Sequence, residues 1–144
     1  MKNLTLQTIS TKAKDIKRNW HLIDIKDKVL GRTAPEIARY LQGKNKTDYV
    51  PYLDTGDFVV VINAKKVAIT GKKLEMKTYT RYSGYPGGLK TVKLSALLEK
   101  NPGEVIKNAV SGMLPKNKYR VERLKRLFIF SDENHPYKDK FVKL

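Results

Sequence analysis

The pattern of apolar positions along the chain predicts alternating strands and helices. Residues 58–62 (FVVVI) and 127–130 (LFIF) are apolar at every position, which is typical of strands covered on both faces. Residues 20–25 (WHLIDI) alternate well enough for another strand, and residues 67–69 (VAI) are predicted to continue the central strand or lie beside it. Strands of this kind are expected in a sheet that is flanked by helices.

Two helices are predicted from apolar spacing together with signals at their ends. Apolar residues at helical spacing predict a helix over residues 34–41, with Thr33 as its N-cap and Gly43 at its end. Asn101 followed by Pro102 is a strong start signal, because Asn caps the first turn and Pro is tolerated there. These helices are expected to present one apolar face each to the sheet.

The remaining segments are more polar. A short helix is predicted over residues 92–99, and a basic helix over residues 119–126 leads into the last strand. Residues 74–81 are rich in Thr and Tyr and are predicted to form an extended arm. Residues 84–88 (GYPGG) exclude regular structure.

The order of these elements predicts an α/β fold. Alternation of strands and helices indicates a single three-layer α/β/α domain with a mostly parallel central sheet, decorated by basic loops. We place this domain at residues 20–144. Residues 1–19 are polar, basic and weakly periodic, so we interpret them as an N-terminal extension that becomes ordered only against a partner.

Charge narrows the possible partners. The chain has 144 residues with 30 Lys and Arg against 14 Asp and Glu, a formal net charge of +16. Unbalanced charge of this size indicates a polyanionic partner, which leaves nucleic acid, an anionic membrane or a very acidic protein. The absence of cysteine excludes disulfides and thiolate chemistry. Because no apolar run is long enough to span a bilayer and no basic amphipathic helix has a broad lipid-facing side, we expect no membrane partner.

Positive charge is concentrated in two segments. In residues 72–93, basic residues alternate with tyrosines and a glycine-rich turn, which would provide phosphate contacts, stacking faces and close backbone approach to RNA. In residues 113–126, a helix would direct Arg120, Arg123 and Arg126 outward and its apolar residues toward the core. The alternative for both segments is an ordinary solvated surface.

Catalytic candidates are few. His21 and His135 could form the acid–base pair of a ribonuclease, but nothing in their spacing brings them together. Asp54 and Asp57 could suggest a metal site, although their positions before a strand are better explained as turn residues. No phosphate-binding glycine motif is present, so no cofactor and no metal are predicted.

Ordered sequence strings add a family resemblance. In chain order they are WHLID (20–24), VLGR (29–32), GKNK (43–46), YVPYLDTGD (49–57), VVINA (60–64), TGK (70–72), KTYTRYSGYPGGLK (77–90) and AVSGMLPK (109–116). Each string alone is modest, but their order and spacing are specific. Along nearly its whole length the chain resembles the L13 family of bacterial large-subunit ribosomal proteins.

The resemblance implies a structural constituent of the large ribosomal subunit that binds large-subunit rRNA directly and acts early in assembly, in the cytoplasm. It also implies neighbouring ribosomal proteins as partners and, as in some family members, the chain's own messenger RNA. The alternatives are a basic nucleic-acid-processing enzyme of ribonuclease type and a DNA-compacting protein. The candidate rRNA-binding residues are Arg32, Lys44, Lys46, Lys72, Lys73, Lys77, Tyr79, Arg81, Tyr82, Gly84, Tyr85, Gly87, Gly88, Lys90, Met113, Lys116, Lys118, Arg120, Arg123, Lys125 and Arg126.

Overall fold

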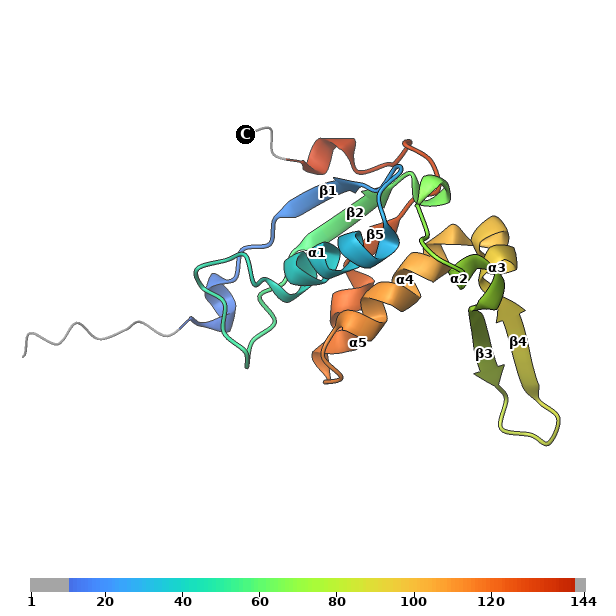
Figure 1. Cartoon of the computed structure of the whole chain (residues 1–144). Coiled ribbons are helices and arrows are strands. Elements are labelled where there is room, and N and C mark those ends of the chain that lie inside the picture. The colour runs from blue at the N-terminus through green and yellow to red at the C-terminus, as the bar shows by residue number, and fades with distance from the viewer. Residues whose placement is uncertain (1–10, 142–144) are drawn as a thin grey trace, which may run out of the picture.

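A parallel sheet lies at the centre of the computed structural model, which describes residues 11–141. Its three strands are β1 (Trp20–Asp24), β2 (Phe58–Ile62) and β5 (Leu127–Ile129), in the order β1-β2-β5 (Figure 1). Both neighbours of β2 pair with it in parallel. The predicted α/β class is therefore confirmed, and the uniformly apolar run at 58–62 is the central strand.

Helices cover one face of the sheet. They are α1 (Leu30–Gln42) and α4 (Pro102–Met113). Val59 and Val61 of β2 are fully buried and share one apolar core with Ile37 of α1 and Ile106 of α4. Because alternate residues of a strand point to opposite faces, these two valines mark the face against which both helices pack.

Aromatic side chains cover the other face. Val60 points to this side and is also fully buried. Trp20 stacks on Phe58 with ring centroids 4.5 Å apart, and Tyr137 of the C-terminal segment lies 4.7 Å from Phe128. Within the described residues, the third layer is thus the C-terminal segment with its 3-10 turn Lys138–Lys140, and no α-helix contributes to it.

Helix α1 starts a turn earlier than its sequence predicts. Thr33 lies inside the helix, so its assignment as N-cap is wrong, and Val29 stands at that position. Val29 pairs with Ala68, and the Leu30 N–H donates to the Ala68 carbonyl at 3.0 Å, which fixes the helix start against residues 67–69. Gly43 ends the helix with φ of 78°, as predicted.

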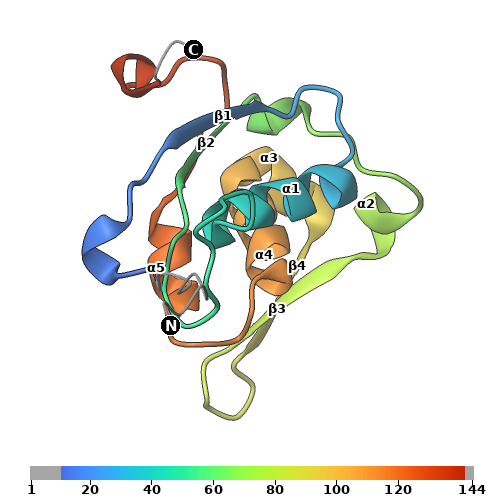
Figure 2. The same ribbon diagram turned by 90° about the vertical axis from the view of Figure 1, so that its left-hand side faces the viewer.

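The basic arm is an antiparallel hairpin that projects from the body (Figures 1 and 2). Strand β3 (Thr78–Tyr82) pairs with β4 (Leu89–Lys93). A short helix, α2 (Lys73–Met76), precedes it, so the predicted extended arm over 74–81 is only partly extended. Helix α3 (Leu94–Lys100) follows β4 directly and begins later than the predicted 92–99.

The remaining helices agree with their start signals. Asn101 caps α4 by accepting a hydrogen bond from the Glu104 N–H, with Pro102 in the first turn. Helix α5 (Tyr119–Lys125) leads into β5, and short 3-10 turns occur at Ala13–Asp15 and Ala64–Lys66. No helix of the described chain has the length and apolarity needed to cross a bilayer.

The sheet makes a direct prediction about Val60. Val60→Asp would bury an unpaired carboxylate in the central strand, so we expect it to destabilise the fold by more than about 4 kcal/mol. The matched control is Leu22→Asp, because Leu22 is the neighbour of Val60 across β1 but is 47% exposed. Circular dichroism and urea unfolding of both variants test this, and a folded Val60→Asp protein would contradict the sheet assignment.

Candidate nucleic-acid interface

The hairpin carries exposed cations without carboxylate partners. Arg81 and Lys90 lie directly opposite each other across the two strands. Like charges in this position repel, so the free hairpin gains from a bound anion. None of the ion pairs formed among the described residues includes a hairpin cation. The exposed cations of this arm are Lys72, Lys73, Lys77, Arg81, Lys90 and Lys93.

The predicted stacking tyrosines divide into two kinds. Tyr82 and Tyr85 are 63% and 76% exposed, so their rings are free to stack on bases. Tyr79 is half-buried against Leu94 and Leu97 at the foot of the hairpin. Burial, together with the nearby carboxylate of Glu104, raises the pKa of the Tyr79 phenol. Its hydroxyl therefore stays protonated and can donate a hydrogen bond.

Glycine is required at the hairpin turn. Gly84 and Gly87 have φ of 90° and 72°, values that other residues rarely adopt, and a Cβ at either would meet nothing within 4 Å. Gly88 donates a hydrogen bond to the Tyr85 carbonyl at 2.9 Å. The turn thus exposes backbone that an RNA chain can approach closely.

Other predicted segments lie on the same side of the molecule as the hairpin tip. The loop after α1 and the loop between α4 and α5 both lie toward the lower side in Figures 1 and 2. Their predicted residues Lys44, Lys116 and Lys118 are exposed, and Met113 is 42% exposed. Arg32 in the first turn of α1 is also exposed. Lys125 is exposed but donates to Glu122 at 2.8 Å.

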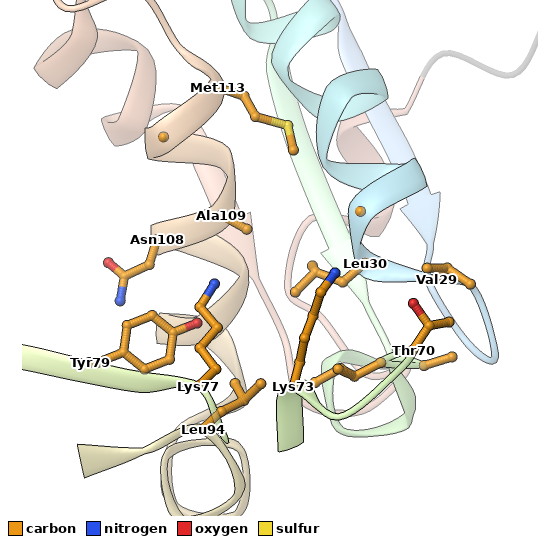
Figure 3. Close-up of a pocket in the computed structure, with 14 residues that line it drawn as sticks. Val29, Leu30, Thr70, Lys73, Lys77, Tyr79, Leu94, Asn108, Ala109 and Met113 are labelled. Atoms are coloured by element: carbon orange, nitrogen blue, oxygen red, sulfur yellow. The ribbon is translucent and has the colours of Figure 1, made fainter. Parts of the chain in front are cut away.

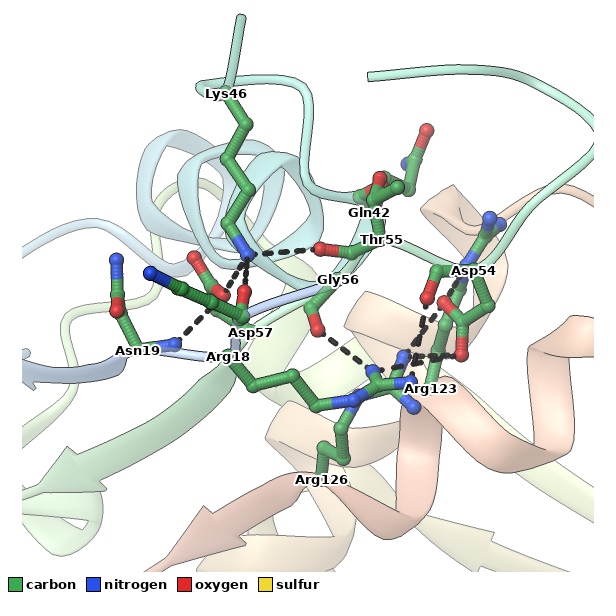
Figure 4. Close-up of polar contacts among 11 residues, drawn as sticks. Arg18, Asn19, Gln42, Lys46, Asp54, Thr55, Gly56, Asp57, Arg123 and Arg126 are labelled. Carbon is green, nitrogen blue, oxygen red and sulfur yellow. Dashed lines mark hydrogen bonds and ion pairs between the residues drawn. The ribbon is translucent and has the colours of Figure 1, made fainter. Parts of the chain in front are cut away.

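The arginines of α5 do not face outward as predicted. Arg123 and Arg126 are only 2% and 8% exposed, and both contact the carboxylate of Asp54 (Figure 4). Arg126 Nη2 lies 2.7 Å and Arg123 Nε 3.3 Å from Asp54 Oδ1. Burial lowers the pKa of the Arg126 guanidinium, whereas the Asp54 carboxylate stabilises its charged form. Both residues therefore hold the fold together and are removed from the candidate RNA surface.

The orientation of α5 about its own axis explains why these arginines are buried. The prediction directed Val121 and Leu124 to the core, but Val121 is 61% exposed, while Leu124 is partly buried beside the arginines. Arg120 is also half-buried and donates to the Ser111 hydroxyl at 2.7 Å. The residue that could have indicated burial of these arginines is Asp54, because a carboxylate can pair with a buried guanidinium group. The sequence interpretation explained Asp54 as a turn residue.

Arg18 joins the same carboxylate from the N-terminal side. Its Nη1 donates to the Gly56 carbonyl at 2.8 Å and lies 3.8 Å from Asp54 Oδ2. Thr11 donates to the Asp48 carbonyl at 3.3 Å, so contacts reach well into the predicted extension. Residues 1–10 of that extension lie outside the described residues.

Asp57 is a second buried carboxylate in the same segment. It accepts hydrogen bonds from the Asn19 N–H and from His21 Nε2, both at 2.9 Å, and pairs with Lys46. Burial opposes its ionisation, but these donors and the Lys46 charge outweigh burial and lower the pKa of Asp57. Lys46 also donates to the Thr55 carbonyl at 3.0 Å, so this predicted RNA-binding residue is already engaged within the fold.

The two histidines have separate surroundings. His21 contacts Asp57 and stacks on Tyr40 with centroids 4.2 Å apart. The ring of His135 lies near Phe130 and Phe141, and its Nδ1 accepts from the Tyr137 N–H at 3.3 Å. Among the described residues 11–141, no contact joins the two histidine rings. The geometry therefore gives the ribonuclease alternative no support.

The cluster of Asp54 with Arg18, Arg123 and Arg126, called the Asp54 cluster below, predicts that one neutral substitution strongly lowers stability. Asp54→Asn would leave two buried guanidinium groups without a counter-charge, and we expect it to lower the free energy of unfolding by about 3–5 kcal/mol. The control is Glu122→Gln in α5, which removes only the exposed pair with Lys125 and should cost less than about 1 kcal/mol. Urea unfolding measures both, and equal midpoints for Asp54→Asn and the wild type would contradict the assignment.

The lowered pKa of Asp57 predicts that this residue causes part of the loss of folding stability at acidic pH. Because its pKa is lower in the folded than in the unfolded chain, its stabilising contribution is complete above the ordinary carboxyl pKa of 3.8 and is lost as pH falls below it. Asp57→Asn should therefore reduce the difference between the urea midpoints at pH 7 and pH 3. Asp132→Asn, which alters an exposed pair with Lys65, is the control. An unchanged pH dependence in Asp57→Asn would refute the role of this carboxylate.

Comparison with known proteins assigns the chain to a family. The family model described as Ribosomal protein L13 matches residues 18–136. The chain is 52% identical over 132 residues to the large ribosomal subunit protein uL13 of Pelobacter propionicus, a match that covers 92% of this chain and 93% of that protein. The uL13 proteins of Kocuria rhizophila and Hahella chejuensis are 48% and 47% identical, with 92% of this chain and 90% and 93% of those proteins covered. The resemblance seen in the ordered sequence strings is thereby confirmed, and the chain belongs to the ribosomal protein L13 family.

Proposed function

We propose that this chain binds large-subunit rRNA directly, through one surface, and that it does so early in subunit assembly. It belongs to a family of structural ribosomal proteins and not of enzymes. The observation that carries the proposal is the β3–β4 hairpin, whose cations lack carboxylate partners among the described residues.

The chemistry of the hairpin fits folded RNA. Its Lys and Arg side chains neutralise phosphates that are crowded together in a compact RNA, and this fixes orientation without reading sequence. The exposed rings of Tyr82 and Tyr85 stack on unpaired bases. The open backbone at Gly84 and Gly87 lets the turn enter narrow spaces between RNA helices.

The proposed surface extends from the hairpin to the two neighbouring loops. These segments lie on the same lower side of the molecule, so one RNA can contact all of them (Figures 1 and 2). Lys46 and Arg120 are engaged within the fold and are assigned a minor part. The surface comprises Lys44, Lys72, Lys73, Lys77, Tyr79, Arg81, Tyr82, Gly84, Tyr85, Gly87, Gly88, Lys90, Met113, Lys116 and Lys118. Arg32 of α1 and Lys125 of α5 are proposed as further contacts outside these segments.

Binding early in subunit assembly is supported by a folded core that forms without RNA. The apolar core and the contacts of Asp54 with Arg123 and Arg126 form within the chain itself, so the protein can bind naked rRNA before other proteins arrive. Neighbouring ribosomal proteins are proposed as later partners. The chain's own messenger RNA is a further candidate because it offers the same phosphates and unpaired bases.

The proposal predicts a charge-dependent affinity for naked rRNA. Replacing Arg81 and Lys90 by Gln removes two phosphate contacts, so the slope of log K against log salt should become shallower by about 1.4, using the single-strand coefficient. The fold should be unaffected, because this change also removes a repulsive cross-strand pair. Filter binding to transcribed large-subunit rRNA over a salt series measures the slope.

The matched control removes the same charge elsewhere. Lys138→Gln with Lys140→Gln changes exposed lysines of the C-terminal 3-10 turn, which lies on the upper side, away from the hairpin. Its salt slope should equal that of the wild type. A wild-type slope near zero, or a preference for duplex DNA in competition, would contradict rRNA binding by this surface.

A further inference from the structure

A cavity opens at the foot of the hairpin, where Lys73, Lys77, Tyr79 and Met113 of the surface described above line it (Figure 3). It has a volume of about 380 Å³ and lies between the start of α1, the last turns of α4 and the segment that leads into β3. This volume is in the range of sites that hold a single small organic group. Much of its wall is apolar, formed by Val29, Leu30, Ile69, Leu94, Ala109 and Met113.

The polar groups of the cavity favour an anion attached to an apolar body. Lys73 and Lys77 line it from the hairpin side, and Figure 3 shows Lys73 reaching into the space between α1 and α4 and Lys77 lying beside Tyr79. The Lys77 amino group lies 5.3 Å from the centroid of the Tyr79 ring. No Asp or Glu lines the cavity, and neither lysine forms an ion pair within the described residues. The Tyr79 hydroxyl and the Asn108 amide provide hydrogen-bonding groups at the same side.

Two glycines keep the cavity open. Gly31 in α1 and Gly112 in α4 both line it, and a Cβ at either position would meet nothing within 4 Å. A larger side chain at these positions would extend into free space without displacing the core. The open walls leave room for a flat ring to enter between the two helices.

We propose that this cavity holds one nucleotide that the bound RNA extrudes from its base stack. The base lies against the apolar walls, and its phosphate binds the amino groups of Lys73 and Lys77. A duplex is too wide for a space of about 380 Å³, whereas a single unstacked base fits. The unpaired lysines favour a nucleotide over an apolar protein side chain. This inference rests on the proposed rRNA binding and adds a specific contact to it.

Substitutions at Gly112 test the cavity without touching charge. Gly112→Leu fills it, whereas Gly112→Ala adds only a methyl group and is the matched control. The full-length protein is bound to transcribed large-subunit rRNA, irradiated with ultraviolet light and analysed by mass spectrometry. We expect one nucleotide crosslinked at Tyr79 or Met113 in the wild type and in Gly112→Ala. In Gly112→Leu the crosslink should be lost and the affinity should fall about tenfold, the scale of one lost stacking contact.

The outcomes separate this inference from the proposed function. If Gly112→Leu retains both crosslink and affinity while the hairpin variant still changes the salt slope, the cavity inference is overturned and rRNA binding stands. Circular dichroism checks the fold, and Gly31→Leu replaces Gly112→Leu should that variant unfold. Micromolar binding of free AMP, GMP, CMP or UMP, followed by NMR, would assign the cavity to a diffusible nucleotide and overturn the RNA source. Crosslinks from Met113 to another protein in purified subunits would overturn it as well.

Discussion

The carboxylate of Asp54 contacts two buried guanidinium groups, and the arrangement of the surrounding elements depends on this contact. Because Arg123 and Arg126 lie at the end of α5, Asp54 attaches that helix and the start of β5 to the loop before β2. The next residues then occupy fixed positions: a Cβ at Gly56 would collide with the Leu41 carbonyl, so only glycine allows the chain to pass the end of α1. The Asp57 carboxylate accepts a hydrogen bond from the N–H of Asn19, the residue just before β1. A four-residue segment thereby aligns the starts of β1 and β2, which pair from Trp20 and Phe58 onward.

The same contact explains how a chain with a net charge of +16 can form a compact core. The cations inside the fold have carboxylate partners: Arg123 and Arg126 contact Asp54, and Lys46 contacts Asp57. The cations of the hairpin lack such partners within the described residues, and Arg81 even faces Lys90. Charge that stabilises the fold is thus separated from charge that is free for an external anion. Total charge indicates a polyanionic partner, but only the local pairing shows which residues can contact it.

Sequence patterns predicted the features that depend on local chemistry. The central position of β2 followed from its unbroken apolar run, and the start of α4 followed from Asn101 and Pro102. The failures concern long-range partners. Thr33 has the chemistry of an N-cap, but pairing of Val29 with Ala68 moves the helix start. Arg123 has the chemistry of an RNA contact, but Asp54, which is distant in sequence, makes burial favourable. Local sequence patterns do not distinguish an arginine that is free to bind a phosphate from one that is paired with a carboxylate within the fold.

The attachment of the hairpin to the core decides how RNA binding and folding are related. At its foot, the Leu94 N–H donates to the Lys77 carbonyl at 2.9 Å, and Tyr79 packs on the apolar cluster of Leu94 and Leu97. Beyond this foot the strands are largely exposed and their facing charges repel. The core therefore fixes where the hairpin begins, whereas its outer part would gain further stability from a bound anion that neutralises these charges. Contacts at the foot act on a rigid junction, so a nucleotide bound there would orient the whole hairpin on the RNA. RNA binding would then complete the structure at its periphery, while the Asp54 cluster has already determined the centre.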